Sequence, residues 1–558
     1  MVTRSRPLGG PTSRPGPSSH PPDDGVPRAA PGRGNDPTCG RVPACCLDWP
    51  VVSSPSVTSQ TTRQSTPPAS RRAAPGPDPD ELQRSQENAV VQMLDVPDVA
   101  DELAARFAAR GHRLYLVGGS VRDALLRGSG GSDREPGDLD FTTDARPEQI
   151  MAAVRGWADA VWDTGIAFGT VGLRRGDRIL EVTTFRADTY DGASRNPEVR
   201  FGDDIGGDLV RRDFTVNAMA VELTGDERRF VDPHGGLAAL AQGVLDTPDV
   251  PERSFSDDPL RMLRAARFVS QLGFTPAERV AAAMTAMAGE LSRITAERVQ
   301  AEFSKLVLGT YPRRAVELLC DTGLAGQVVP EVPAMQLETD EHMQHKDVYT
   351  HSLVVMEQAI ERETDGPDLT LRLAALLHDI GKPATRRKEP DGRVSFHHHE
   401  VVGAKMTRKR LRALKYPKAL IDDVTQLVYL HLRFHGYGKG EWTDSAVRRY
   451  VTDAGPLLDR LHRLVRSDCT TRNRRRAAAL QRNYDGLEDR IAELRRQEEL
   501  DAIRPDLDGN AIMELLGIGP GPAVGKAYKY LLALRMEEGP LGPERAEAEL
   551  RAWAAENL

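Results

Sequence analysis

The chain has 558 residues, of which 39% are hydrophobic and 28% are charged, and its formal net charge at pH 7 is −8. At roughly 150 residues per domain this length predicts three or four domains, and no apolar run approaches the roughly 18 residues that a membrane helix needs. The five cysteines lack the spacing of a disulfide framework or a Cys-rich zinc site, so we expect a cytoplasmic protein. We also expect no membrane contact. Because the net charge is slightly negative, a nucleic-acid partner would need local basic patches.

Residues 1–88 form the first segment, which is rich in Pro, Gly, Ser and Arg and has Trp49 as its only aromatic residue. Such a composition cannot bury enough apolar surface to offset the conformational entropy that is lost on ordering. We therefore expect a disordered N-terminal extension.

From about residue 95 the sequence alternates between helical and strand patterns. Expected helices cover 99–109 and 121–126, and expected strands cover 113–117, 139–143 and 179–185. This mixture predicts a head with a mixed sheet over residues 95–240. Helical patterns rich in Ala, Leu and Arg then continue to the last residue, so the predicted fold class is α+β with an all-α body.

Two features of the head suit phosphate chemistry. Gly118-Gly119 stands between a predicted strand and a predicted helix, where backbone N–H groups can approach a phosphate. Asp138 and Asp140 are two apart on a predicted strand and so share a face, where they repel each other unless a cation lies between them. Mg²⁺ prefers oxygen ligands and retains substrate phosphates, and Glu181 on a later strand is a candidate third carboxylate. Each feature alone is also common in turns and exposed strands, but their close spacing favours metal-assisted phosphoryl transfer.

Arginines gather in two later segments. Arg211-Arg212 follows Asp208 and fits either a surface ion-pair network or a clamp on a triphosphate. Further along, Asp258 and Arg261 are i, i+3 neighbours on a predicted helix, and Arg264 and Arg267 continue that side. The pattern alone is also typical of a charged helix face.

Together these segments resemble the class II nucleotidyltransferases, the bacterial CCA-adding enzymes and their poly(A) polymerase relatives, over about residues 95–310. The resemblance implies that Asp138 and Asp140 hold two Mg²⁺ ions, and Glu181 stays a candidate further catalytic carboxylate. It implies that a helical neck over 241–335 recognises the nucleotide base. The implied nucleotide-binding residues are Gly119, Arg122 and Arg212 at the phosphates, Asp258 and Arg261 at the base edge, and Arg264 and Arg267 at further positions. Asp257 stands where family members usually have Glu, which leaves its role open.

The function implied by the resemblance is addition of C, C and A to tRNA 3′ ends from CTP and ATP, through a two-metal in-line attack. A poly(A) polymerase is the alternative within the same superfamily. Those enzymes generally carry a Gly-Arg/Lys-Arg/Lys-Phe segment after the carboxylate strand, whereas residues 161–171 here have no basic pair, which favours CCA addition. The sequence carries no signal for an oligomeric state.

The helical body contains His351, the pair His378-Asp379, and Asp468. His351 and Asp468 fall on apolar stripes of predicted helices, where polar groups are costly unless they are paired, and a metal ion would satisfy them together. Histidine and carboxylate ligands suit Mn, Fe, Ni or Zn better than Mg. A lone buried histidine, in contrast, is usually only a hydrogen-bonded core residue.

The order of these residues resembles the HD phosphohydrolase superfamily, over about residues 345–470 within a domain predicted at 340–470. The resemblance implies His351, His378, Asp379 and Asp468 as metal ligands, with His399 and His431 as possible ligands of a second ion. Whether this site is active is left open. A third hypothesis is an HD-type phosphohydrolase of RNA ends, in which the head only binds RNA.

The predicted RNA contacts lie in basic clusters over 405–418 and 472–476, which could equally be solvated helix faces. Residues 471–558 are expected to form a helical C-terminal tail that binds RNA by its shape. Turns between short helices are predicted over 505–509 and 519–526.

Overall fold

A computed structural model describes residues 88–94, 96–128, 137–186, 202, 204–336, 347–436, 442–471, 473–498 and 503–558. The extension predicted over 1–88 lies outside these described residues apart from Asn88, and so does Arg472 of the second basic cluster. Among the described residues, no helix is both long and apolar enough to cross a membrane.

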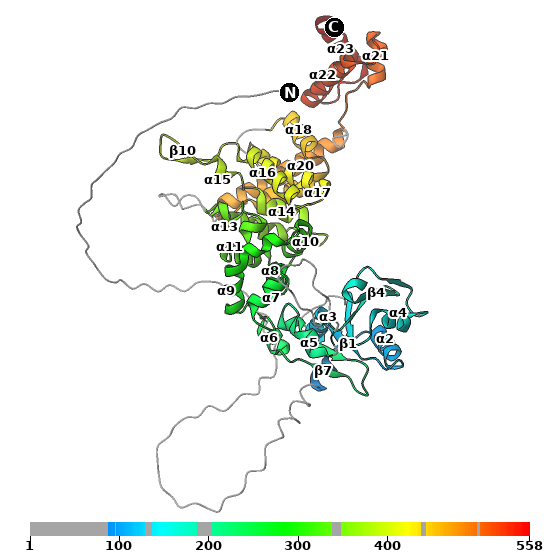
Figure 1. Ribbon diagram of the computed structural model, residues 1–558. Helices are drawn as coiled ribbons and strands as arrows, with labels where there is room; N and C mark the ends of the chain where they lie inside the picture. Colours follow the sequence, from blue (N-terminus) through cyan, green and yellow to red (C-terminus); the bar gives the residue numbers. More distant parts are fainter. Residues whose placement is uncertain are drawn as a thin grey trace, which may run out of the picture. The chain divides into compact units, whose positions relative to one another are not determined.

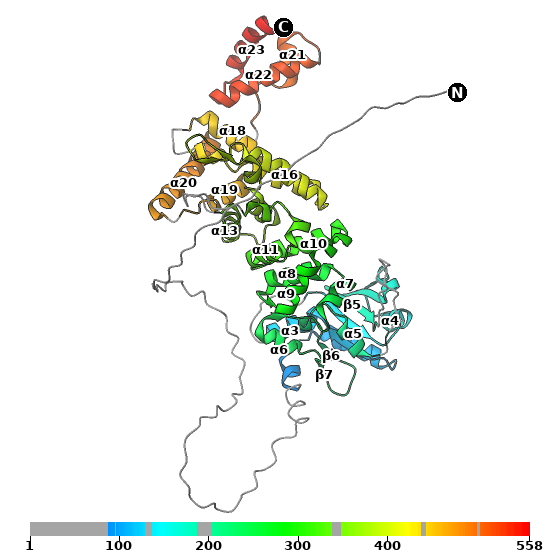
Figure 2. The same ribbon diagram turned by 60° about the vertical axis from the view of Figure 1, so that its left-hand side comes forward.

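The head contains a seven-stranded sheet with the strand order β3-β4-β5-β2-β1-β6-β7. Its strands are β1 (Leu114–Val117), β2 (Leu139–Thr143), β3 (Ala160–Trp162), β4 (Thr170–Arg175), β5 (Arg178–Thr184), β6 (Ala220–Glu222) and β7 (Arg229–Val231). β2 and β5 run parallel, whereas all other neighbouring pairs in this sheet are antiparallel. The predicted mixed sheet is therefore confirmed. Figures 1 and 2 draw its strands as arrows in the blue-to-cyan part of the chain.

Helices cover one face of this sheet. They are α2 (Asp98–Ala108), α3 (Gly119–Gly128) and α4 (Pro147–Val154). Their buried side chains, such as Phe107 and Ile150, share one hydrophobic core with Phe141 of β2. Burial of each such side chain stabilises the fold by about 1.5–3 kcal/mol, which fixes the face that β2 turns inward. Because side chains alternate along a strand, Asp140 lies on the opposite face.

A helical neck follows the head. α5 (Ile205–Val210) still belongs to the head, because it precedes β6 and packs on β1, and the connecting elements are α6 (Gly236–Gln242) and the two-residue strands β8 (Val244–Leu245) and β9 (Thr275–Pro276). The neck helices are α7 (Pro251–Asp257), α8 (Leu260–Leu272), α9 (Glu278–Met287), α10 (Ala296–Val307), α11 (Pro312–Asp321) and α12 (Ala325–Val328). Both α10 and α11 pack on α8, whose buried face includes Leu263 and Ala266.

The rest of the chain is helical apart from a hairpin of β10 (Arg387–Lys388) and β11 (Val394–Ser395). Its helices are α13 (Val348–Ile360), α14 (Leu369–Leu377), α15 (Lys382–Thr385), α16 (His399–Ala413), α17 (Lys418–Leu430), α18 (Asp444–Ala454), α19 (Leu458–Ser467) and α20 (Arg474–Gln497). The C-terminal helices are α21 (Gly509–Leu516), α22 (Pro522–Glu538) and α23 (Pro543–Asn557). The predicted all-α body is thus confirmed.

The predicted elements of the head agree with the observed bounds to within two residues, and β2 matches its predicted range of 139–143. One predicted turn is partly wrong. Residues 519–526 were expected to form a turn, but α22 begins at Pro522. Proline is well suited to a first helical turn because its missing N–H would have no partner there, so this residue starts a helix.

Candidate functional sites

The three carboxylates of the head lie on one face of the sheet. β2 and β5 pair in a register that sets Asp140 directly opposite Glu181, and Asp138 immediately precedes β2. Paired residues point to the same side of a sheet, so these acidic groups converge away from the hydrophobic core. Both aspartates and the start of α3 line one cleft of about 240 Å³. Its lining residues are Gly119, Ser120, Asp123, Arg127, Gly137, Asp138, Leu139 and Asp140.

Ser120 and Gly118 fix the carboxylate strand against the start of α3. The Ser120 hydroxyl accepts a hydrogen bond from the Asp140 N–H at 2.9 Å and donates to the Asp138 carbonyl at 3.3 Å. Gly118 has a left-handed φ of +69°, and a Cβ there would lie 2.9 Å from Nη1 of Arg212 and 3.8 Å from Oδ2 of Asp140. Glycine at this position therefore allows the turn to approach both side chains closely.

The charges on the carboxylate face of the head sheet favour a bound cation. Burial raises the pKa of Asp140 to about 6; Arg212 opposes the shift, whereas Glu181 and Asp138 add to it. Neighbouring carboxylates repel one another when ionised, and a divalent ion with oxygen ligands relieves that repulsion. The donor set of this site therefore fits a hard divalent cation.

A second cleft of about 350 Å³ shares Asp140 with the first. Six arginines line it together with further carboxylates. The lining residues are Val117, Asp140, Phe141, Glu181, Thr183, Arg186, Arg211, Arg212, Asp213, Asp258, Leu260, Arg261, Arg264 and Arg298. Arginine side chains that converge beside carboxylates provide the multi-donor contacts that a polyphosphate needs.

Buried aspartates hold the arginines of this cleft in place. Both oxygens of the fully buried Asp208 accept from arginines, one from Arg211 at 2.9 Å and the other from Arg212 at 3.0 Å. Burial alone would raise the pKa of Asp208, but these two guanidinium groups hold it below its ordinary value. In the same way, Nε and Nη2 of Arg264 donate to Oδ2 of Asp213 at 2.8 and 2.5 Å.

Asp258 and Arg261 enter the cleft from the junction of α7 and α8. Oδ2 of Asp258 accepts from Arg298 at 2.8 Å, and its Oδ1 accepts the Leu260 N–H at 3.1 Å. Arg261 donates to the Ser254 hydroxyl at 2.8 Å and to the Arg211 carbonyl at 2.6 Å. The two side chains are therefore positioned before any ligand binds, one as a hydrogen-bond acceptor and one as a donor.

Two of the expected nucleotide contacts lie outside both clefts. Arg122 donates to Asn217 at 2.6 Å and to Asp123 at 2.8 Å, and its guanidinium lies 5.1 Å from the centroid of the Phe268 ring. Arg267 pairs with Glu302 at 3.2 Å and lies 4.5 Å from the same centroid. Each residue is only 8% exposed, and both guanidinium groups pack against Phe268 of α8, so their contact with a nucleotide stays a prediction.

A Gly118→Ala substitution tests how far the close approach at this turn matters. The added Cβ meets Nη1 of Arg212, so we expect this guanidinium to be displaced from beside the turn and the phosphoryl transfer expected from the sequence to slow by about tenfold or more, equivalent to roughly 1.4 kcal/mol. Gly156→Ala is the matched control, because Gly156 also has a positive φ, of +71°, but a Cβ there meets nothing within 4 Å. Equal turnover numbers for the two variants would contradict the assigned role of Gly118.

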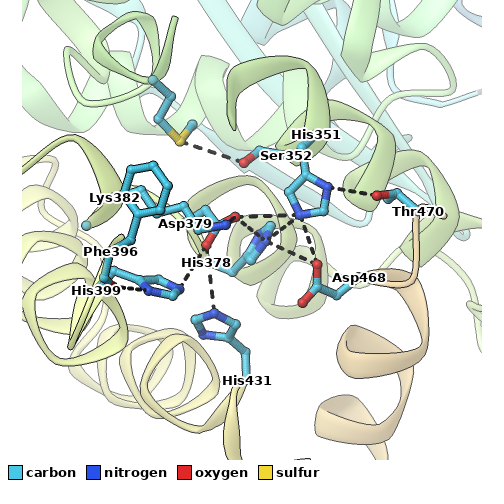
Figure 3. Close-up of polar contacts among 12 residues, drawn as sticks. His351, Ser352, His378, Asp379, Lys382, Phe396, His399, His431, Asp468 and Thr470 are labelled. Carbon is cyan, nitrogen blue, oxygen red and sulfur yellow. Dashed lines mark hydrogen bonds and ion pairs between the residues drawn. The ribbon is translucent and has the colours of Figure 1, made fainter. Parts of the chain in front are cut away.

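A separate centre lies in the helical body, where six candidate ligands converge (Figure 3). They form two groups, His351 with His378 and Asp468, and Asp379 with His399 and His431. Within each group the ligand atoms all lie within 4.8 Å of one another. Nε2 of His351 lies 2.9 Å from Oδ1 of Asp468. Asp379 lies between the groups, with Oδ2 3.2 Å from Nε2 of His378 and Oδ1 3.2 Å from Nε2 of His399.

Backbone carbonyls set the tautomers of three of these histidines. Nδ1 of His378 lies 2.8 Å from the Ala375 oxygen, Nδ1 of His399 lies 2.8 Å from the Phe396 oxygen, and Nδ1 of His431 lies 2.6 Å from the Val428 oxygen. An Nδ1 that faces a carbonyl carries the proton, so in a neutral ring Nε2 presents a lone pair. When the rings are neutral, their Nε2 lone pairs face Asp379, an arrangement that a bound cation would stabilise.

His431 is the clearest case. Its Nε2 atom is buried, lies 3.9 Å from Oδ1 of Asp379, and makes no hydrogen bond with any residue that the structure describes. Burial lowers the pKa of His431 to about 3, so the ring is neutral at pH 7. A buried neutral imidazole whose Nε2 lone pair has no hydrogen-bond partner among the described residues fits a metal ligand, and mixed nitrogen and carboxylate donors suit transition metals. Sequence reasoning had named all six of these residues.

The sequence missed several residues that contact these sites. Arg186 and Arg298 line the second cleft of the head, but Arg298 comes from α10 and carries no local motif. In the body, Lys382 donates to Oδ2 of Asp379 at 2.6 Å. Its place three residues after Asp379, in the first turn of a helix, is a signal that could have suggested this contact.

Comparisons with known proteins agree with this division of the chain. Residues 114–246 match the family described as poly A polymerase head domain, residues 273–335 match the probable RNA and SrmB-binding site of polymerase A, and residues 348–469 match the HD domain. Both matched catalytic domain families depend on divalent metal ions.

Whole-length relatives extend these matches. The A-adding tRNA nucleotidyltransferase of Deinococcus radiodurans is 35% identical over 450 residues, which cover 79% of this chain and 95% of that protein. A CCA-adding enzyme from Anoxybacillus flavithermus is 32% identical over 355 residues, which cover 63% of this chain and 74% of that protein. The crystal structure of the Bacillus stearothermophilus CCA-adding enzyme with CTP is similar with a TM-score of 0.59 and 25% identity, over 82% of this chain and 97% of the other.

Proposed function

Because this chain belongs to the family of tRNA nucleotidyltransferases that contains the CCA-adding enzymes, we propose that it adds C, C and A to the 3′ ends of tRNA from CTP and ATP. One observation carries the proposal. Asp138, Asp140 and Glu181 share a face beside the Gly118-Gly119 turn, and Asp140 joins their cleft to the arginine-lined cleft.

In the proposed reaction Asp138 and Asp140 would hold divalent ions, taken to be Mg²⁺; when bound, such ions would supply activation of the RNA 3′-hydroxyl and charge stabilisation for the leaving pyrophosphate. Arg211 and Arg212, fixed by Asp208, bind the triphosphate and orient it for in-line attack. The N–H groups at the start of α3 add a favourable dipole for phosphate, and Glu181 completes the acidic face.

Asp258 and Arg261 are the proposed readers of the incoming base. Cytosine and adenine each present an exocyclic amine and a ring acceptor, which match a carboxylate acceptor and a guanidinium donor. Both side chains line the arginine-lined cleft and are fixed by neighbouring groups. A site whose polar groups pair only with the correct edge can reject a wrong base by roughly 10⁴-fold.

Addition of the terminal A alone is a second candidate, because the Deinococcus relative that matches over 95% of its length is named an A-adding enzyme. Three tRNA substrates separate the two functions: one lacking all three terminal residues, one ending in C, and one ending in CC. Each is incubated with a single labelled nucleotide. Incorporation of CTP into the first two substrates together with ATP into the third supports full CCA addition. ATP incorporation into the third substrate alone supports A addition, and long A tails would support the poly(A) polymerase hypothesis.

We also propose a metal-dependent phosphohydrolase activity at the centre of the body, with a transition metal as its ion. The converging His351, His378, Asp379 and Asp468 support it, and His399 and His431 support a second ion. Phosphate release from RNA ends, in the absence of nucleotides, tests this activity. Phosphate release without any extension of tRNA would favour the hypothesis of a hydrolase whose head only binds RNA.

Exposed basic residues of α16 are the proposed contacts to the tRNA backbone. Arg408 and Arg410 of the first basic cluster pair with Asp422 and Glu331, which leaves Lys405, Lys409 and Arg412 of this helix exposed. A tRNA substrate also favours a cytoplasmic location.

We further propose that the neck contributes base recognition and that residues 471–558 contact RNA. RNA binding is expected to weaken steeply as the salt concentration increases.

A further inference from the structure

A tryptophan lies in the same row of the sheet as the catalytic carboxylates. In the strand register Trp162 of β3 pairs with Gly172 of β4, Gly172 pairs with Glu181 of β5, and Glu181 pairs with Asp140 of β2. Paired residues share a face, so Trp162 projects from the same side of the sheet as Glu181 and Asp140.

The indole of Trp162 lies over Gly172. A Cβ at position 172 would be 2.0 Å from Nε1 of the indole and 2.3 Å from its Cε2, so any other residue there would displace the ring. The ring therefore extends from the edge strand over β4, toward the row position of Glu181. Trp162 remains 36% exposed, although an indole gains most by full burial.

The next row on this face adds an aliphatic and a cationic side chain. Arg174 of β4 pairs with Ile179 of β5, two positions along each strand from Gly172 and Glu181. Both side chains are exposed. A flat aromatic ring beside an arginine is the combination that binds single-stranded RNA, because the ring stacks on a base and the guanidinium pairs with a phosphate.

The spacing of the strands places this surface within reach of the reaction centre. Neighbouring strands lie about 4.8 Å apart, so Trp162 on β3 is about 10 Å from Glu181 and about 14 Å from Asp140. One or two nucleotides of an RNA 3′ end can span such a distance. Because the surface is continuous with the carboxylates that act on the 3′-hydroxyl, the end of the acceptor strand is the occupant that fits it best.

On the basis of the proposed function, we infer that Trp162 is a binding residue for the tRNA primer, stacking on a base at its 3′ end and holding the terminal hydroxyl near Asp138 and Asp140. Gly172 permits this position of the ring, and Arg174 pairs with a backbone phosphate. The surface recognises any base, since every base offers an aromatic face, which suits a primer whose last residue changes at each addition.

The test compares Trp162→Ala with Trp162→Phe in the full-length protein. Loss of one stacked base predicts a rise of about 5- to 150-fold in KM for tRNA with Trp162→Ala, whereas KM for CTP stays within about twofold and Trp162→Phe recovers most of the loss. Val161→Ala is the matched control, because Val161 is also exposed but, next to Trp162 on β3, points to the other face.

A spectroscopic readout separates stacking from a structural effect. A tRNA that carries 2-aminopurine as its last residue should lose fluorescence on binding to the wild-type protein, and less so on binding to Trp162→Ala or Gly172→Ala. Equal quenching and equal KM for tRNA in Trp162→Ala and Val161→Ala would overturn the inference while leaving the proposed function intact. A wild-type protein that fails to extend tRNA would instead refute the proposed function.

Discussion

An Asp140→Asn substitution is expected to abolish nucleotide addition to tRNA, with a loss of at least about 10³-fold in turnover. The reason is that Asp140 lines both clefts of the head and is paired with Glu181, so it is the carboxylate that joins the acidic site to the arginines. Charge stabilisation by a bound divalent ion is worth several kcal/mol, and each 1.4 kcal/mol is a factor of ten in rate. Incorporation of labelled CTP into tRNA lacking its terminal residues measures the loss.

The matched control is Asp177→Asn, an equal change of charge at an exposed position between β4 and β5 of the same sheet. This variant should retain activity within about twofold. Metal content and phosphate release at the body centre should be unchanged in both variants, because the centre uses other residues. A turnover of Asp140→Asn within tenfold of the wild type would refute the role assigned to the carboxylates.

The same substitution should not destabilise the metal-free protein. Burial raises the pKa of Asp140 from 3.8 to about 6, so the ionised group costs about 3 kcal/mol of folding free energy at neutral pH. The protonated carboxyl is favoured in the folded state, so this cost is absent below about pH 4, grows as the pH rises to about 6, and is constant above. Thermal unfolding in a chelating buffer should show Asp140→Asn at least as stable as the wild type at pH 7, with no gain at pH 4.

Local patterns explain why the carboxylate site could be predicted from the sequence. The spacing of Asp138 and Asp140 and the turn at Gly118-Gly119 depend only on neighbouring residues, and β2 formed where it was expected. The row that joins Trp162, Gly172 and Glu181 could not be predicted, because the order and register of the strands depend on contacts between distant segments. The sequence determines those contacts, but no local pattern of residues indicates which distant segments pair.

The burial of individual side chains could not be predicted from the sequence either. Arg264 and Arg267 follow one another at a helical step, yet Arg264 lines the arginine-lined cleft whereas Arg267 pairs with the buried Glu302. Three consecutive histidines likewise differ in how far their side chains are exposed. The side chains of His397 and His398 are 75% and 83% exposed, whereas that of His399 is 10% exposed, because His398 takes a left-handed φ of +60° before α16 and the chain turns inward.

An Asp379→Asn substitution is expected to remove the metal of the body centre and, with it, any phosphohydrolase activity. Asp379 approaches both groups of ligands, with Oδ2 3.2 Å from Nε2 of His378 and Oδ1 3.2 Å from Nε2 of His399. An amide in its place cannot balance the charge of an ion, and it would present an N–H₂ group to one set of imidazole lone pairs. Loss of a ligand that serves both groups should lower hydrolysis by at least about 10³-fold.

A second variant separates one ion from two. His431 belongs only to the group with Asp379 and His399, so His431→Gln should remove the second ion and leave the ion that is held by His351, His378 and Asp468. Elemental analysis of the purified protein counts the ions, and His397→Ala is the control, because that side chain is 75% exposed. If Asp379→Asn retains the wild-type metal content, the centre is a hydrogen-bonded core. No residue of the body centre lines either cleft of the head, so Asp379→Asn should leave nucleotide addition intact. If this variant loses nucleotide addition while it is still folded, the head and the body do not act as two independent sites.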